Sequence, residues 1–205
     1  MEPTWLDWAR RLQAIAQSGL AYSPSQYDLE RYEAVREIAA EMMADGSGSA
    51  VAPIRDLFAG QAGHATPKVD VRAAVFQQDR LLLVREREDG GWTLPGGWAE
   101  VGQSAAESVE REVREESGYL VKAVKLLACW DRNKHLHPAI PFHAYKLVFR
   151  CELAGGAPSA SAETSEVGFF AEGQIPPLSL TRILPEQLQF VFRSLRDPMA
   201  PAVFD

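Results

Sequence analysis

Three glutamates, Glu112, Glu115 and Glu116, fall on one predicted helix at a spacing that could hold a cation. A helix advances by about 100° per residue, which places the three carboxylates in one narrow sector beside an apolar stripe. They are therefore expected to be partly desolvated, and rigid oxygen ligands of this kind suit Mg²⁺ or Mn²⁺. The alternative is a solvated acidic face. Repulsion between Glu112 and Glu116, four residues apart, favours a compensating cation.

A glycine-rich segment, "TLPGGWAEVG" at residues 93–102, precedes this helix. Glycine lets the backbone turn sharply and come close to a ligand. Gly96 and Gly97 are therefore predicted to offer carbonyl oxygens to the metal shell and amides to phosphate oxygens. The alternative is an ordinary strand-to-helix turn.

Residues 97–119 resemble the Nudix box, a signature written G-x5-E-x7-R-E-U-x-E-E-x-G-U in which U is aliphatic. Gly97 opens the match and "REVREESGY", residues 111–119, closes it. The sequence departs from the signature at Gln103, in place of the early glutamate, and at Tyr119, in place of the last aliphatic residue. The three metal-binding glutamates of the signature are all present.

The departure at Gln103 raises the question of which residue supports Arg111. In the family the early glutamate is mainly a partner of the motif arginine. Glu107 precedes Arg111 by four residues, a spacing at which side chains meet on a helix. We therefore expect Glu107 to take over this pairing.

The N-terminal region resembles the helical extension of Nudix hydrolases that act on nucleoside diphosphates linked to X, a branch that includes CDP-choline pyrophosphatases. The resemblance rests on "WLDWARRLQAIAQSGLAYS" and "YDLERYEAVREIAAEMMA". It implies hydrolysis of a pyrophosphate bond into a nucleoside monophosphate and phospho-X, generally by a homodimer. CDP-choline is the first candidate substrate and ADP-ribose the main rival. A catalytically silent, nucleotide-sensing Nudix-like domain is the alternative class, which the intact glutamates disfavour.

Such a reaction needs a group that accepts a proton from the attacking water. Glu116 itself is one candidate. The resemblance implies two more, Glu163 and Glu166, because related enzymes often supply a carboxylate from a loop at the place of "SAETSEVGFF", residues 161–170. The alternative for both loop glutamates is a purely solubilising role.

Substrate contacts are expected from "DRNKHLHP", residues 131–138, which connects two predicted strands. Cationic side chains there suit phosphates, and a carboxylate suits a sugar or a positive head group. Trp98 could stack on a base or hold a trimethylammonium group by cation–π attraction. A polar connecting loop and a core tryptophan are the alternatives. The candidates in the loop are Asp131, Arg132, Lys134 and His135.

These residues need a scaffold, which the chain divides into a small helical N-terminal domain, residues 1–60, and a catalytic domain, residues 65–205. Apolar residues at helical spacing predict one helix ending at Gly19 and a second beginning near Asp28. The rest mixes β-rich runs with a helix after the glycines and another near Pro185. The fold class is α/β, and the resemblance implies a Nudix α/β/α sandwich with a mixed sheet.

Composition agrees with a soluble enzyme. The 205 residues are 46% hydrophobic and 24% charged, and no apolar run reaches the roughly 18 residues of a membrane span. The N-terminus lacks the features of a signal peptide, which predicts a cytoplasmic protein without a membrane partner. The net charge of -7 argues against bulk nucleic-acid binding.

Overall fold

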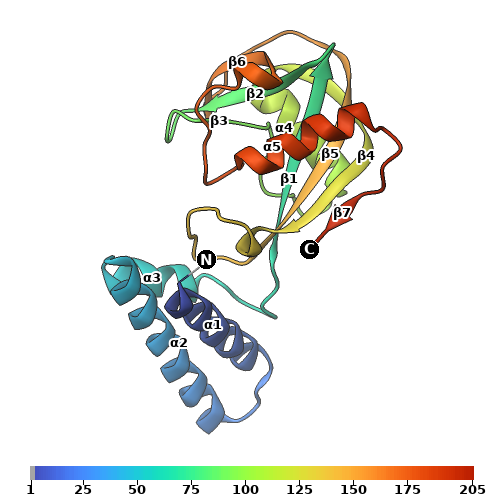
Figure 1. Ribbon diagram of the computed structural model, residues 1–205. Helices are drawn as coiled ribbons and strands as arrows, with labels where there is room; N and C mark the ends of the chain where they lie inside the picture. Colours follow the sequence, from blue (N-terminus) through green and yellow to red (C-terminus); the bar gives the residue numbers. More distant parts are fainter. Residues whose placement is uncertain (1–2) are drawn as a thin grey trace. The chain divides into compact units, whose positions relative to one another are not determined.

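A computed structural model describes residues 3–205 of the chain, which form two compact units. One comprises the chain up to residue 67 together with residues 139–143, and the other comprises residues 68–138 and 144–205. Figure 1 shows helices α1 to α3 in the first unit and the sheet with α4 and α5 in the second. None of the helices formed by residues 3–205 is both long and apolar enough to cross a membrane.

The first unit is helical and has its own small core. Its helices are α1 (Thr4–Tyr22), α2 (Gln26–Ser47) and α3 (Val51–Ala59). Small and apolar side chains from all three pack together, as amphipathic helices require. The buried residues of this core are Leu6, Ala9, Ala39, Ala40, Met43, Ala44, Ile54 and Phe58.

Gly19 does not end α1, so that expectation was wrong. The helix continues to Tyr22. A Cβ on Gly19 would lie 2.4 Å from the ring of Tyr32, and one on Gly46, inside α2, would lie 2.2 Å from the ring of Trp5. Both glycines therefore make room for an aromatic ring of the neighbouring helix.

The second unit is built on one mixed sheet. The strand order is β3-β2-β1-β5-β4-β7, with β6 paired to β2. β1 runs parallel to β5 and β4 parallel to β7, whereas the other pairs are antiparallel. The strands are β1 (Lys68–Gln77), β2 (Arg80–Glu86), β3 (Trp92–Thr93), β4 (Tyr119–Asp131), β5 (Ala144–Gly156), β6 (Thr164–Ala171) and β7 (Val203–Phe204).

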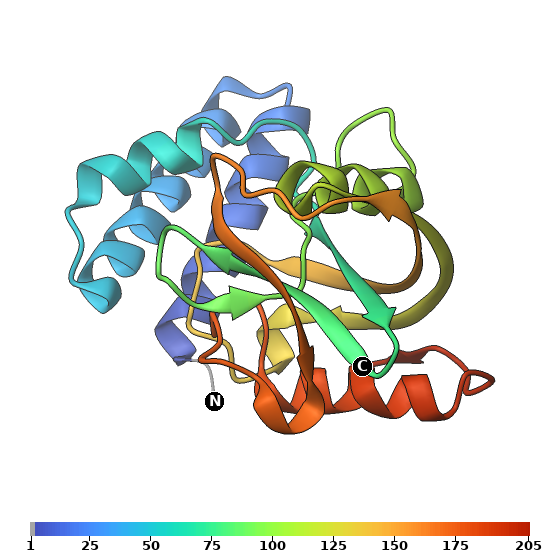
Figure 2. The same cartoon turned by 90° about the horizontal axis from the view of Figure 1, so that it is seen from above.

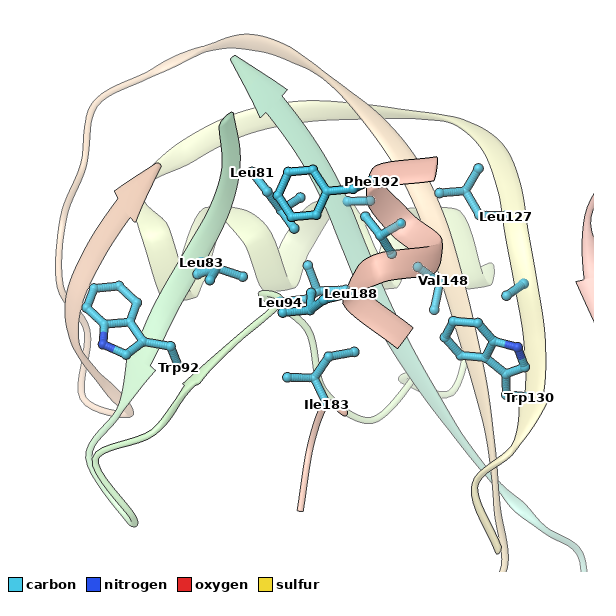
Figure 3. Close-up of a cluster of buried hydrophobic side chains, with 13 residues drawn as sticks. Leu81, Leu83, Trp92, Leu94, Leu127, Trp130, Val148, Ile183, Leu188 and Phe192 are labelled. Atoms are coloured by element: carbon cyan, nitrogen blue, oxygen red, sulfur yellow. The ribbon is translucent and has the colours of Figure 1, made fainter. Parts of the chain in front are cut away.

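Helices α4 (Ala105–Ser117) and α5 (Pro185–Arg196) cover opposite faces of this sheet (Figure 2). Val71 and Ala73 of β1 face a core that includes Val109 and Val113 of α4. Ala74 faces the other core, in which α5 packs on the sheet (Figure 3). This alternation confirms the predicted α/β/α sandwich with a mixed sheet, preceded by helices.

β4 and β5 are the longest of the described strands, with 13 residues each. β4 and β5 extend through Tyr119–Asp131 and Ala144–Gly156 because they pair with each other across irregular register shifts. β3 and β7, of two residues each, carry no alternation that could have predicted them. Short 3₁₀ turns, η1 (Arg132–Lys134) and η2 (Glu172–Gln174), follow β4 and β6.

Candidate active site

Helix α4 begins and ends with strong local signals, which fix where its carboxylates lie. Ser104 is the N-cap: its hydroxyl accepts a bond from the Glu107 amide, and the Glu107 carboxylate accepts one from the Ser104 amide. Gly118, with a positive φ of 74°, provides the left-handed C-cap. Tyr119, at the departure from the signature, packs edge-on against Phe169 with ring centroids 5.5 Å apart.

Arg111 joins the side chains around it into one network. Its Nε donates to Gln103 Oε1 at 3.2 Å, one Nη to Glu115 at 2.6 Å, and the other to Glu112 at 2.8 Å. Gln103 thus keeps the pairing with the motif arginine. The expectation that Glu107 would take it over was wrong, because the capping box already engages the Glu107 carboxylate.

This network yields a prediction about Gln103. Gln103→Ala removes the neutral acceptor that orients Arg111, and Arg111 in turn orients two carboxylates. Changes in such supporting partners cost roughly 10–100-fold in activity, so we expect about a tenfold lower kcat. Glu107→Ala is the matched change: it should lower the melting temperature through the lost cap, with kcat nearly unchanged. Steady-state kinetics and thermal melting of both variants test this prediction. A lower kcat for Glu107→Ala than for Gln103→Ala would contradict it.

Glu116 is the most deeply buried of the three glutamates, with 5% of its surface exposed. Its Oε2 accepts a bond of 2.8 Å from the Gly96 amide. Burial raises the pKa of Glu116 to about 8, while Arg72 and the Gly96 amide act in the opposite direction and Glu86 and Glu112 add repulsion. A buried carboxylate with acidic neighbours is a place where a cation would be stabilised.

The glycine loop runs antiparallel along β1. The Val71 amide donates to Gly97 O at 2.8 Å, and the Ala73 amide donates to Pro95 O at 2.9 Å. Gly96 has a φ of 144°, and a Cβ there would lie 2.0 Å from Val71 O. Only glycine fits at this position. The same pairing engages the Gly97 carbonyl, whereas the Gly96 amide holds Glu116.

The donor set fits a hard divalent cation. Burial raises the pKa of Glu112, and Arg111 opposes this shift. Two partly desolvated carboxylates, Glu112 and Glu116, therefore lie where a metal charge would favour their ionised form. Arg111 bonds both Glu112 and Glu115, and within residues 3–205 no three His, Cys, Asp or Glu side chains are gathered into a ready-made metal site.

Sequence reasoning missed two buried charged residues beside this cluster. Arg72 Nε donates to Asp70 at 2.9 Å and its Nη1 to Leu94 O at 3.1 Å, and its charge opposes the rise that burial causes in the pKa of Glu116. Glu86 is held by Arg182 Nε at 2.9 Å, and burial raises its pKa. The sequence shows Arg72 and Glu86 only as polar residues in strands, because their neighbours come from distant segments.

The two loop candidates for the base lie in different surroundings. Glu166 lies on β6 and its carboxylate bonds Arg85 at 2.6 Å on the surface. Glu163 precedes β6, is exposed, and its charge raises the pKa of Glu86. Glu163 directly precedes Thr164, the partner of Glu86 in the sheet, and this position favours it over Glu166 as the candidate base.

Most polar side chains of the predicted substrate loop form hydrogen bonds within the protein. Asp131 caps η1 through the Asn133 amide at 3.0 Å. Arg132 is buried and donates to Pro138 O at 2.9 Å and Thr181 O at 3.0 Å. His135 Nε2 lies 3.1 Å from the Asp205 carboxylate. Lys134 is exposed, which leaves its ammonium accessible to an anion.

Trp98 belongs to the glycine segment rather than to this loop. It forms an isolated bridge with Asp70, so both side chains are expected on the same face of the sheet. The Trp98 side chain is 47% exposed. The residue therefore presents accessible aromatic surface next to Gly97, where a base or a head group could stack.

Comparison with known protein families gives two matches along the chain. Residues 66–191 match the family model described as NUDIX domain. Residues 3–58 match a model described as "UDP-X-like, N-terminal oligomerisation domain".

Among individual proteins, Bacillus subtilis YjhB, which bears the provisional name ADP-ribose pyrophosphatase, is 46% identical over 205 residues, covering 100% of this chain and 99% of its own. A solved structure of an ADP-ribose pyrophosphatase from Streptococcus suis is 41% identical with a TM-score of 0.63, covering 68% of this chain and all of that one. A crystal structure of a UDP-X diphosphatase is 31% identical with a TM-score of 0.64, covering 98% of both chains.

Proposed function

Because the chain belongs to the Nudix family and is a Nudix hydrolase, we propose that it hydrolyses the pyrophosphate bond of a nucleoside diphosphate linked to X. The products are a nucleoside monophosphate and phospho-X. The observation that carries this proposal is the buried carboxylate of Glu116 beside the partly buried carboxylate of Glu112, next to a glycine loop whose amide bonds Glu116.

The proposed cofactor is Mg²⁺ or Mn²⁺. Glu112, Glu115 and Glu116 would hold it, with backbone oxygens of Gly96 and Gly97 nearby. When bound, a divalent ion neutralises charge on the pyrophosphate and lowers the pKa of a water molecule. The chain's own part is to keep Glu116 in place through the Gly96 amide and to hold Glu112 through Arg111.

A carboxylate is proposed to accept the proton of the attacking water. Glu163 is preferred, with Glu166 and Glu116 as alternatives, because Glu163 adjoins Thr164, the sheet partner of Glu86, whereas the Glu166 carboxylate is bonded to Arg85. Trp98 and Lys134 are the proposed substrate contacts with accessible side chains. Asp131, Arg132 and His135 are proposed to shape the loop that carries Lys134.

For the substrate, we propose ADP-ribose as the first candidate. Its support is the pyrophosphatase name of the full-length Bacillus subtilis relative and of the Streptococcus suis structure. UDP-linked compounds are second, since a UDP-X diphosphatase matches over almost the whole chain. CDP-choline, the first candidate by resemblance of the N-terminal helices, becomes the third.

A substrate panel tests this proposal. Purified protein with Mg²⁺ is incubated with ADP-ribose, a UDP-sugar, CDP-choline and a nucleoside triphosphate, and the products are identified by mass. We expect ADP-ribose to give AMP and ribose 5-phosphate with the highest kcat/KM, and EDTA to abolish turnover. Binding of these compounds without turnover would support the silent-domain alternative, whereas turnover of the triphosphate alone would exclude the proposed substrate class.

We also propose a homodimer formed through the helical unit. Trp8 and Ile15 lie seven residues apart on α1 and are 53% and 56% exposed, so one helix face carries large uncovered apolar side chains. The description of the matching family model as an oligomerisation domain supports this assignment.

A further inference from the structure

Helix α4 ends against a distant segment of the chain. The last carbonyls of a helix have no partner within it and need donors from elsewhere. The Ser159 amide donates to Ser117 O at 2.9 Å, and Thr164 Oγ1 donates to Glu116 O at 2.6 Å. The segment of residues 159–164 therefore closes the end of the helix that carries the acidic cluster.

Thr164 is placed for this bond by the sheet. It is the first residue of β6, is fully buried, and lies opposite Glu86 of β2. The register shifts at this point, because Arg85 pairs with Glu166 but Glu86 pairs with Thr164. Such β-bulges redirect side chains and are frequent beside active sites.

The same turn holds the backbone of Glu163. Ser161 Oγ accepts bonds from the Glu163 amide at 3.1 Å and the Thr164 amide at 3.0 Å, and it lies 3.1 Å from Thr164 Oγ1. On the other side, the Arg87 amide donates to Glu163 O at 2.9 Å. Glu163, the candidate base, is therefore connected to the backbone of Glu116 through the buried hydroxyl of its neighbour Thr164.

We propose that Thr164 is a positioning residue, whose hydroxyl fixes the separation between Glu163 and the carboxylates of α4. The proposal rests on the proposed function, in which Glu163 accepts a proton. The competing role is a purely structural one, in which Thr164 only satisfies the carbonyl at the helix end.

The test compares Thr164→Val, which keeps the shape and removes the hydroxyl, with Thr164→Ser, which keeps the hydroxyl. Small displacements of catalytic groups cost up to roughly a hundredfold in rate. We expect Thr164→Val to lower kcat on the best panel substrate by about 10–100-fold with KM nearly unchanged, and Thr164→Ser to restore most of it. In a Glu163→Gln background, Thr164→Val should have little further effect.

Ser194→Ala is the matched control, because it also removes a buried hydroxyl that donates to a helix carbonyl, Val191 O at 2.7 Å, on α5. It should leave kcat unchanged even if it lowers the melting temperature. If Thr164→Val does not fold, Thr164→Ala replaces it, since that change also removes the hydroxyl that donates to Glu116 O.

Amide hydrogen exchange measures how firmly Glu163 and the end of α4 are held, independently of turnover. Thr164→Val should speed exchange at Glu163 and at the end of α4, whereas Ser194→Ala should not. The positioning role would be overturned if Thr164→Val exchanged faster but kept the wild-type kcat. It would also be overturned if Thr164→Val lowered kcat by the same factor in the wild-type protein and in the Glu163→Gln variant. If the wild-type enzyme cleaves no compound of the panel, the proposed function fails, and unchanged exchange in Thr164→Val would separately refute the coupling.

Discussion

Replacing Glu116 by glutamine should nearly abolish turnover while leaving the fold intact. The side chain keeps its size and its carbonyl can still accept the Gly96 amide, but it loses the charge that would bind a metal. Loss of a supporting partner of a metal ligand already costs roughly 10–100-fold, so we expect loss of the ligand to lower kcat by about 10³-fold. Steady-state kinetics over a range of Mg²⁺ concentrations measure this.

The same change should stabilise the metal-free protein at neutral and alkaline pH. The pKa of Glu116 rises from 4.5 to about 8 on folding, so the folded state binds the proton more tightly than the unfolded state. Stability therefore falls as pH rises from about 4.5 to about 8, and below that window this group has no effect. At 1.36 kcal/mol per pKa unit, the penalty above pH 8 is at most about 5 kcal/mol. Glutamine removes it.

Glu110→Gln is the control on the same helix. Glu110 bonds the Ala123 amide at 2.9 Å and Lys122 at 3.1 Å, away from the acidic cluster. Its replacement should leave both kcat and the slope of melting temperature against pH unchanged. Wild-type turnover in Glu116→Gln would contradict the assignment of Glu116. So would a metal-free Glu116→Gln protein whose stability falls with rising pH as steeply as that of the wild type.

Deleting residues 1–60 should convert the proposed dimer into a monomer and reduce the preference for ADP-ribose over CDP-choline. The helical unit carries exposed Trp8 and Ile15, and burying apolar surface contributes roughly 25 cal/mol per Å². Light scattering gives the mass, and the substrate panel gives kcat/KM for each compound. We expect the mass to halve and the preference for ADP-ribose over CDP-choline to shrink by about tenfold, which corresponds to 1.4 kcal/mol.

Point variants separate the interface from the loss of a whole domain. Trp8→Ser with Ile15→Ser should also weaken the dimer, whereas Met199→Ser, at an exposed apolar residue of the other unit, should not. A truncated protein that stays dimeric and keeps the wild-type ratio of kcat/KM for ADP-ribose to that for CDP-choline would show that the helical unit contributes neither to assembly nor to specificity.

Local patterns were enough to predict the helix that carries Glu112, Glu115 and Glu116. The capping sequence at Ser104, the helical spacing of the glutamates and the glycine at position 118 act within one or two turns, so the sequence alone determines α4. The sequence likewise indicates that the backbone at Gly96 needs a conformation that glycine allows. Resemblance in the same short segment then indicated the family, and its matching domain model spans residues 66–191.

Tertiary structure decided which side chains meet. Gln103 rather than Glu107 bonds Arg111, because the capping box and the fold of the preceding loop orient both. Gly19, a plausible helix end by sequence, instead makes room for Tyr32 of the next helix.

Arg72 and Glu86 become neighbours of Glu116 only because β1 and β2 lie beside α4 in space. Thr164 reaches Glu116 O from 48 residues away. Helical and turn preferences act between near neighbours in the chain, whereas partners in the site are brought together by packing of the sheet. The sequence therefore determined which chemistry is present, and only the folded sheet decided which residues hold it in place.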